Sequence, residues 1–280
     1  MAPYTPRAPS HASQDDHAQP RRTSSVSAGH HDIPARPPSA NGQRFSQSYP
    51  LSPVSPPNSL LKSDLDSLKR YDLVFLVSDS PTMGQNGKWQ ECGELLSHLA
   101  RVAMLYDSDG IEIHFLNNDN ERSDQNFSSE EDVEAMFQSV ISPDGSSRLT
   151  DKLDLLVSEY RGQLGRYIDS NPAKRWRTRP VPKKAIYVVL TDGNHADTKK
   201  ILDIISDMAG FLKSIQAPST QFGIEFVQIG DSADFEWLHR ARYQDNKVRS
   251  VTGVDVYNGR VLDDVQAGSM LLRPVSGDSN

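Results

Sequence analysis

Cysteine is nearly absent from this 280-residue sequence, since Cys92 is the only one. A single cysteine excludes an intramolecular disulfide, and no group of cysteine and histidine has the spacing of a zinc site. The sequence also has no apolar stretch of about 18 residues, and its first residues lack the apolar core of a signal peptide. Together these absences predict a soluble intracellular protein, cytoplasmic in location, that does not bind membranes.

The loops that mark several enzyme families are also missing. There is no Gly-x-x-x-x-Gly-Lys phosphate loop, no Gly-x-Gly-x-x-Gly after a strand and no Gly-x-Ser-x-Gly elbow. Phosphatases of the haloacid dehalogenase type need Asp-x-Asp-x-Thr after the first strand. With Thr82 as the threonine, both aspartate positions are serines, Ser78 and Ser80. We therefore predict that the protein is not an enzyme, although fold class alone excludes no chemistry.

Residues 1–60 differ in composition from the rest of the chain. They hold 11 of the 18 prolines, are rich in serine, histidine and arginine, and show no apolar period. Such a segment cannot bury enough apolar surface to offset the entropy lost on ordering, so we predict a disordered tail and linker over 1–70. The chain carries −7 and these 60 residues +2, which leaves −9 for the remainder. An acidic domain of this kind argues against binding to nucleic acid.

From residue 71 onward, strand-like runs alternate with helix-like runs. Short apolar runs typical of buried strands cover 72–77, 111–116, 184–190 and 222–229, with a weaker one at 254–257. Helical spacing covers 89–106, 129–140, 149–168, 197–215, 233–242 and 261–272, and a short helix at 60–69 leads in. This alternation predicts a doubly wound, mostly parallel α/β domain over 71–272, Rossmann-like, with helices on both faces. The last residues, 273–280, are expected to be flexible.

Polar loops interrupt this pattern in three places. Ser78-Asp79-Ser80-Pro81-Thr82 follows the first strand, Thr191-Asp192-Gly193 follows the strand KAIYVVL, and the segment 143–147, PDGSS, precedes a long helix. In doubly wound sheets, ligands bind outside the carboxyl ends of the strands, so we expect these loops to lie together. Hydroxyl and carboxylate oxygens suit Mg²⁺, Mn²⁺ or Ca²⁺. The same residue types also shape turns and cap helices, and Thr82 is a candidate cap for the next helix.

In order and spacing, the three loops resemble those of von Willebrand factor type A domains. That family has Asp-x-Ser-x-Ser after the first strand, a threonine in a later Gly-x-Thr loop, and Thr-Asp-Gly after the central strand. VFLVSDSPTM places Ser80 and Thr82 at the hydroxyl positions, PDGSSRLTDKL places Ser147 at the threonine, and VVLTDGNHAD makes Asp192 the carboxylate. The resemblance thus implies a metal-ion-dependent adhesion site formed by Ser78, Ser80, Thr82, Ser147 and Asp192.

Ser78 stands where the family has aspartate. Asp192 is then the one carboxylate among the matched positions, and a lower ligand charge weakens binding of a divalent cation. Asp79 is adjacent, but successive side chains at a strand end point to opposite faces, so it does not replace the missing ligand. We therefore predict a degraded site that binds Mg²⁺ or Mn²⁺ weakly or not at all.

The resemblance implies a protein-interaction module, in which an acidic side chain of a protein partner completes the coordination of the metal. Without a metal, binding would depend on the loop surface, with Asp79, Asp192, Asn194 and His195 as candidate contacts at its rim. The alternative is a scaffold that binds through another face while the tail recruits regulators. A cryptic enzyme is the third hypothesis.

Overall fold

The computed structural model describes residues 62–117, 126–140, 143, 145, 148–170, 182–193, 197–230 and 235–276. Residues 1–61 of the predicted disordered tail therefore lie outside the described residues. Three of the predicted site residues, Ser147, Asn194 and His195, also lie outside them. Within the described ranges, every helix is too short or too polar to cross a membrane.

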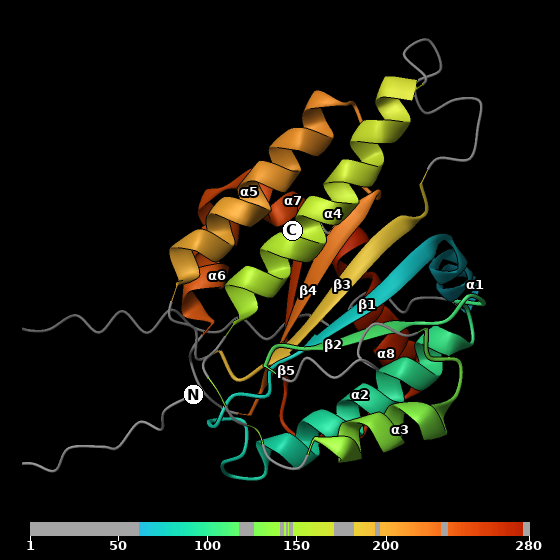
Figure 1. Ribbon diagram of the computed structural model, residues 1–280, viewed down its shortest axis with the longest axis vertical. Helices are drawn as coiled ribbons and strands as arrows, with labels where there is room; N and C mark the ends of the chain where they lie inside the picture. The colour runs from blue at the N-terminus through green and yellow to red at the C-terminus, as the bar shows by residue number, and fades with distance from the viewer. Residues whose placement is uncertain are drawn as a thin grey trace, which may run out of the picture. The chain divides into compact units, whose positions relative to one another are not determined.

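One sheet of five parallel strands forms the centre of the described domain, in the order β2-β1-β3-β4-β5 (Figure 1). The strands are β1 (Tyr71–Val77), β2 (Glu112–Phe115), β3 (Lys184–Thr191), β4 (Phe222–Ile229) and β5 (Thr252–Tyr257). Each pair of neighbours is parallel. Strands of such a sheet are covered on both faces, which explains why their sequences are continuous apolar runs.

Helices cover both faces of the sheet. They are α1 (Lys62–Leu65), α2 (Lys88–Met104), α3 (Glu130–Ser139), α4 (Leu149–Ser170), α5 (Thr198–Ser214), α6 (Glu236–Gln244), α7 (Asn246–Val251) and α8 (Asp264–Leu272), with the 3-10 helices η1 (Asp66–Arg70) and η2 (Arg273–Val275). In Figure 1, α2, α3 and α8 lie on one side of the sheet and α4 to α7 on the other. Alternate residues of β1 supply the two cores: Phe75 packs on the α2 side and Leu76 on the α4 side. The predicted doubly wound α/β fold is confirmed.

The folded domain is longer at both ends than the predicted range 71–272. Leu65 and Leu68, which precede β1, are buried in the core on the α2 side. At the other end, Pro274 and Val275 of η2 are buried. A Cβ atom at Gly223 would lie 2.8 Å from a carbon of each of them, so the bare glycine of β4 leaves the space that η2 fills. These contacts correct the boundary that the sequence placed at Leu272.

Two local features of the structure differ from what the sequence predicted. Helix α2 begins at Lys88 after Gly87, whose φ is +77°, so Thr82 does not cap it. Helix α7 was not predicted. It begins where the side chain of Asp245 accepts a hydrogen bond from the backbone N–H of Lys247.

Candidate functional site

The strand order creates a topological switch point between β1 and β3. The chain leaves β1 toward β2 on one side and leaves β3 toward β4 on the other, so the loops that follow the two neighbouring strands diverge. The backbone N–H of Ser78 donates to the carbonyl of Leu190 at 2.9 Å. The two polar loops therefore start side by side at the carboxyl edge, the position where sheets of this type bind ligands.

Three hydroxyl groups of the β1 loop form a chain of close contacts. Ser78 Oγ donates to Ser80 Oγ at 3.4 Å, and Ser80 Oγ lies 3.1 Å from Thr82 Oγ1. Ser78 and Ser80 are buried and Thr82 is half-buried. A turn fixes the group, since the N–H of Met83 donates to the carbonyl of Ser80 at 2.9 Å. Three of the residues expected to form one site are thus brought together.

The carboxylate of Asp79 bonds to the chain just past β2. Its Oδ1 accepts a hydrogen bond from the backbone N–H of Asn117 at 2.8 Å, just past the end of β2, and the residue is only 2% exposed. Successive side chains at a strand end point to opposite faces, so a partner other than that of Ser78 is expected for Asp79. Asp79 was predicted to be an exposed contact at the rim, and this prediction is wrong because the residue is buried. Its carboxylate instead connects the β1 loop to the end of β2.

The segment that precedes α4 also reaches this edge. A Cβ atom at Gly84 would lie 3.7 Å from the ring of Pro143, and one at Gly145 would lie 3.0 Å from the side chain of Asn117. The PDGSS segment therefore touches both the β1 loop and the end of β2 at its described residues. Ser147 itself, like Asn194 and His195, lies outside the described residues.

Asp192, the matched carboxylate, is paired with a lysine. Nζ of Lys88 donates to Oδ2 of Asp192 at 2.9 Å; the aspartate side chain is 2% exposed and the lysine side chain 18%. Lys88 is the first residue of α2, and its carbon chain passes the end of β4, where a Cβ at Gly230 would lie 3.5 Å from Cε. Lys88 was not among the residues predicted for the site. One feature of the sequence could have indicated it: a lysine lies in the first turn of a helix, where the helix dipole favours acidic residues.

These residues do not fit a divalent cation as they stand. The described donors at the matched positions are three neutral hydroxyl groups and one carboxylate, and that carboxylate already accepts from an ammonium group. A cation that approached Asp192 would be repelled by the charge of Lys88 at close range. Sites for Mg²⁺ or Ca²⁺ depend on the number of charged oxygen ligands, and this site has too few.

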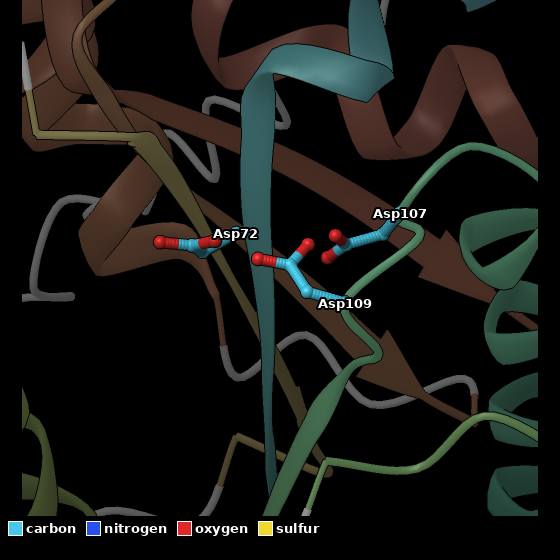
Figure 2. Close-up of side chains that lie close together, drawn as sticks. All are labelled: Asp72, Asp107 and Asp109. Carbon is cyan, nitrogen blue, oxygen red and sulfur yellow. The ribbon is translucent and has the colours of Figure 1, made fainter. Parts of the chain in front are cut away.

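A second polar cluster lies at the opposite, amino edge of the sheet. Carboxylate oxygens of Asp72, Asp107 and Asp109 lie within 4.8 Å of one another (Figure 2). Lys183, next to β3, places Nζ 2.9 Å from Asp72 Oδ1 and 2.6 Å from Asp107 Oδ1, and also contacts Asp109. Its ammonium group therefore occupies the place that a cation would take among the three carboxylates.

The ionisation of this amino-edge cluster follows from burial and hydrogen bonding. Burial raises the pKa of Asp107 to about 6, with Lys183 opposing the rise. Hydrogen bonds from Asp107 and Lys183 lower the pKa of the more exposed Asp109 to about 2. Burial works against the charge of Lys183, but its hydrogen bonds to the three carboxylates raise its pKa above the usual value. The cluster is thus a network of three carboxylates that share one ammonium group, in which burial and hydrogen bonding move the pKa values of Asp107 and Asp109 apart.

Comparison with known proteins assigns no family to this chain. No family model matches the sequence, and no curated protein gives a match. The resemblance to type A domains therefore depends on the loop residues of the sequence alone.

Proposed function

We propose that the protein is a non-catalytic protein-interaction module of the von Willebrand factor type A kind, with a degraded divalent-metal site, and that it binds its partner through the loops at the carboxyl edge. The observation that carries this proposal is the meeting of the β1 and β3 loops at the switch point. The ion pair of Lys88 with Asp192 supports the loss of the metal, because it engages the only carboxylate at the matched positions.

Among the described residues of the β1 and β3 loops, the exposed ones lie in the segment 81–87. Asp79 and Asp192 are buried, whereas Pro81 and the residues 84–87 are exposed. The segment has a fixed shape: the N–H of Gln85 donates to the carbonyl of Thr82, and Asn86 has a φ of +56°. A loop that is already ordered loses little entropy on binding, which favours a role as a docking surface.

The hydrogen bonding of the site supports binding rather than catalysis. Among the described residues, the side chains of Ser78, Ser80 and Thr82 bond to one another rather than to a histidine or carboxylate base. A serine or threonine nucleophile needs an adjacent base to activate it. Metal-dependent turnover in a hydrolase screen of the purified chain, abolished by Asp192→Asn, would overturn the non-catalytic part of the proposal.

Partner capture with two matched variants tests the docking surface. Gln85→Arg adds bulk and charge to the exposed β1 loop, and Gln216→Arg makes the same change at an exposed glutamine between α5 and β4, at the amino edge. Both sites are exposed, so stability should change by no more than about 0.5 kcal/mol.

We expect quantitative proximity labelling with the full chain to lose its enriched partners in Gln85→Arg and to keep them in Gln216→Arg. If Gln85→Arg keeps every partner, the loop is not the docking surface. Loss of partners in Gln216→Arg alone would favour the scaffold that binds through another face.

A further inference from the structure

We propose that the outer edge of β5 is a strand-pairing surface for a second copy of this chain, and that the ion pair of Asp255 with Arg273 keeps this edge closed. β5 is the last strand of the sheet, so within the described ranges β4 is the one strand that pairs with it. An edge strand presents a row of N–H and C=O groups to which another chain can add. The proposal is independent of the proposed function, which concerns the loops after β1 and β3.

The backbone groups of β5 point alternately toward β4 and toward the outer edge. The N–H of Gly230, just past β4, donates to the carbonyl of Tyr257, so the backbone of Tyr257 faces β4. Successive residues of a strand alternate in this direction, so the backbone groups of Thr252, Val254 and Val256 point outward. All three residues have an outward backbone group that is bonded by a side chain.

One ion pair closes two neighbouring outward groups. Nη1 of Arg273 donates to the carbonyl of Val254 at 2.9 Å, and Nη2 of the same guanidinium donates to Oδ2 of Asp255 at 2.8 Å. Oδ1 of Asp255 accepts a hydrogen bond from the backbone N–H of Val256 at 2.8 Å. The two charged side chains are 20% and 14% exposed, so much of the pair is shielded from water. Shielding strengthens these bonds against competition by solvent.

A second arginine reaches the same edge from the other face of the sheet. Arg242 of α6 donates to the carbonyl of Thr252. Leu238 of α6 packs in the core on the α4 side, whereas Val275 of η2 packs in the core on the α2 side. Thr252 and Val254 are only 2% and 8% exposed, although they belong to an edge strand. Charged side chains at an edge are one of the ways in which proteins prevent pairing between sheets.

The outward groups that remain identify the occupant as a second copy. Among the described residues, no side chain bonds the N–H of Val254 or the carbonyl of Val256. In an antiparallel pair, two opposite residues exchange both N–H···O bonds. Val254 opposite Val256 of a second copy therefore matches an unbonded donor with an unbonded acceptor, and matches the two closed groups with each other. The match occurs twice about a two-fold axis when β5 pairs with itself.

The same register explains why the edge stays closed in the unaltered chain. Asp255 lies between Val254 and Val256, so the two copies of Asp255 would stand directly opposite one another at the centre of the pair. Like charges in that position are destabilising. The carboxylate therefore opposes pairing in two ways: it occupies the N–H of Val256, and it repels its own counterpart.

Removing the carboxylate should open the edge. Asp255→Ala frees the N–H of Val256, takes away the acceptor that holds Arg273 and removes the repulsion between the two copies. We expect sedimentation of the full chain to show a dimer whose association constant is at least about tenfold above that of the unaltered chain. The matched control, Asp203→Ala, makes the same change of charge in an exposed ion pair on α5 and should sediment like the unaltered chain.

A proline tests whether the contact is the edge of β5. Val256→Pro removes the outward N–H, and proline is tolerated in an edge strand where the N–H faces solvent. Added to Asp255→Ala, it should return association to the level of the unaltered chain. Amide hydrogen exchange gives an independent readout: the N–H of Val254 should become protected with rising concentration in Asp255→Ala, and should not in the variant that also carries the proline.

Three outcomes overturn the proposal. The first is a folded Asp255→Ala that associates no more strongly than the unaltered chain. The second is a dimer that the added proline leaves intact, since the contact would then lie on another surface. The third is protection of the N–H of Val254 at every concentration in a monomer, because a segment of the same chain would then cover the edge.

Arg273→Lys covers the case in which Asp255→Ala does not fold. Lysine keeps a positive charge near the buried Glu225, but it lacks the planar fork that bonds Val254 and Asp255 at once. This variant should associate more strongly than the unaltered chain, and the added Val256→Pro change should cancel the gain. A folded Arg273→Lys with no gain in association contradicts the proposal.

Discussion

Nζ of Lys88 lies 2.9 Å from Oδ2 of Asp192, which joins the first residue of α2 to the loop after β3. The arrangement recurs at the other edge of the sheet, where Lys183 contacts Asp72, Asp107 and Asp109. At each edge, an ammonium group of the chain itself compensates a buried carboxylate. The buried carboxylates at both ends of the parallel strands are thus paired with lysine side chains of the same chain.

The amino-edge cluster should contribute strongly to stability. Lys183→Met leaves Asp107, whose side chain is fully buried, without its counter-ion, so the free energy of unfolding should fall by about 2–4 kcal/mol. Chemical denaturation measures the change. The control is Lys199→Met, which removes an exposed pair with Asp203 one helical turn away and should cost no more than about 0.5 kcal/mol. Similar losses in the two variants would show that the cluster contributes no more than a surface pair.

Gly253 of β5 should tolerate no side chain. A Cβ atom there would overlap Oε2 of Glu225 and lie 3.2 Å from Cγ of Arg273, so Gly253→Ala should lower the free energy of unfolding by about 2–3 kcal/mol. The matched control is Gly210→Ala in α5, where nothing lies within 4 Å of the added carbon. That change should stabilise the helix by about 0.5–1 kcal/mol. Thermal unfolding of both variants checks the opposite signs, and a stable Gly253→Ala would contradict the packing described.

Glu225 should make stability depend on pH. It is fully buried in β4, and burial raises its pKa well above the ordinary value while Arg273, 3.8 Å away, opposes the rise. The folded protein therefore keeps a proton that the unfolded chain releases. The free energy of unfolding should fall as pH rises above the ordinary carboxyl pKa of about 4.3.

The variant Glu225→Gln isolates this contribution, because it keeps the shape of the side chain and removes its titration. We expect it to be more stable than the unaltered chain by about 1 kcal/mol near pH 8, and the difference to shrink toward about pH 5. Denaturation of both proteins across this range gives the two slopes. Parallel slopes would mean that Glu225 titrates normally despite its burial.

The sheet was predictable because buried parallel strands leave a simple pattern. Runs of apolar residues placed β1, β3 and β4 to within one residue. The start of β5 was missed, since Thr252 and Gly253 are not apolar, and the glycine is there to make room for Glu225 from the neighbouring strand. Helix α7 was missed because only Val248 and Val251 of its six residues are buried, too few to show a period.

The candidate site was predictable only in part. Topology alone places the hydroxyls of Ser78 and Ser80 near the loop of Asp192, because the carboxyl ends of neighbouring parallel strands share an edge. The lysine was not predictable from a motif, since its partner lies 104 residues away and its own position looks like a solvated helix start. The burial of Asp79 was missed for a similar reason: its partner is a backbone N–H, which leaves no mark in the sequence.

A double-mutant cycle on Lys88→Met and Asp192→Asn tests whether the two side chains are paired energetically. Free energies of unfolding are measured for the unaltered chain, both single variants and the double variant. We predict a coupling energy of about 1–3 kcal/mol, with the double variant losing less than the two single losses added together. A coupling within about 0.3 kcal/mol of zero would show that lysine and aspartate do not pair in solution, and would contradict a site held by its own cation.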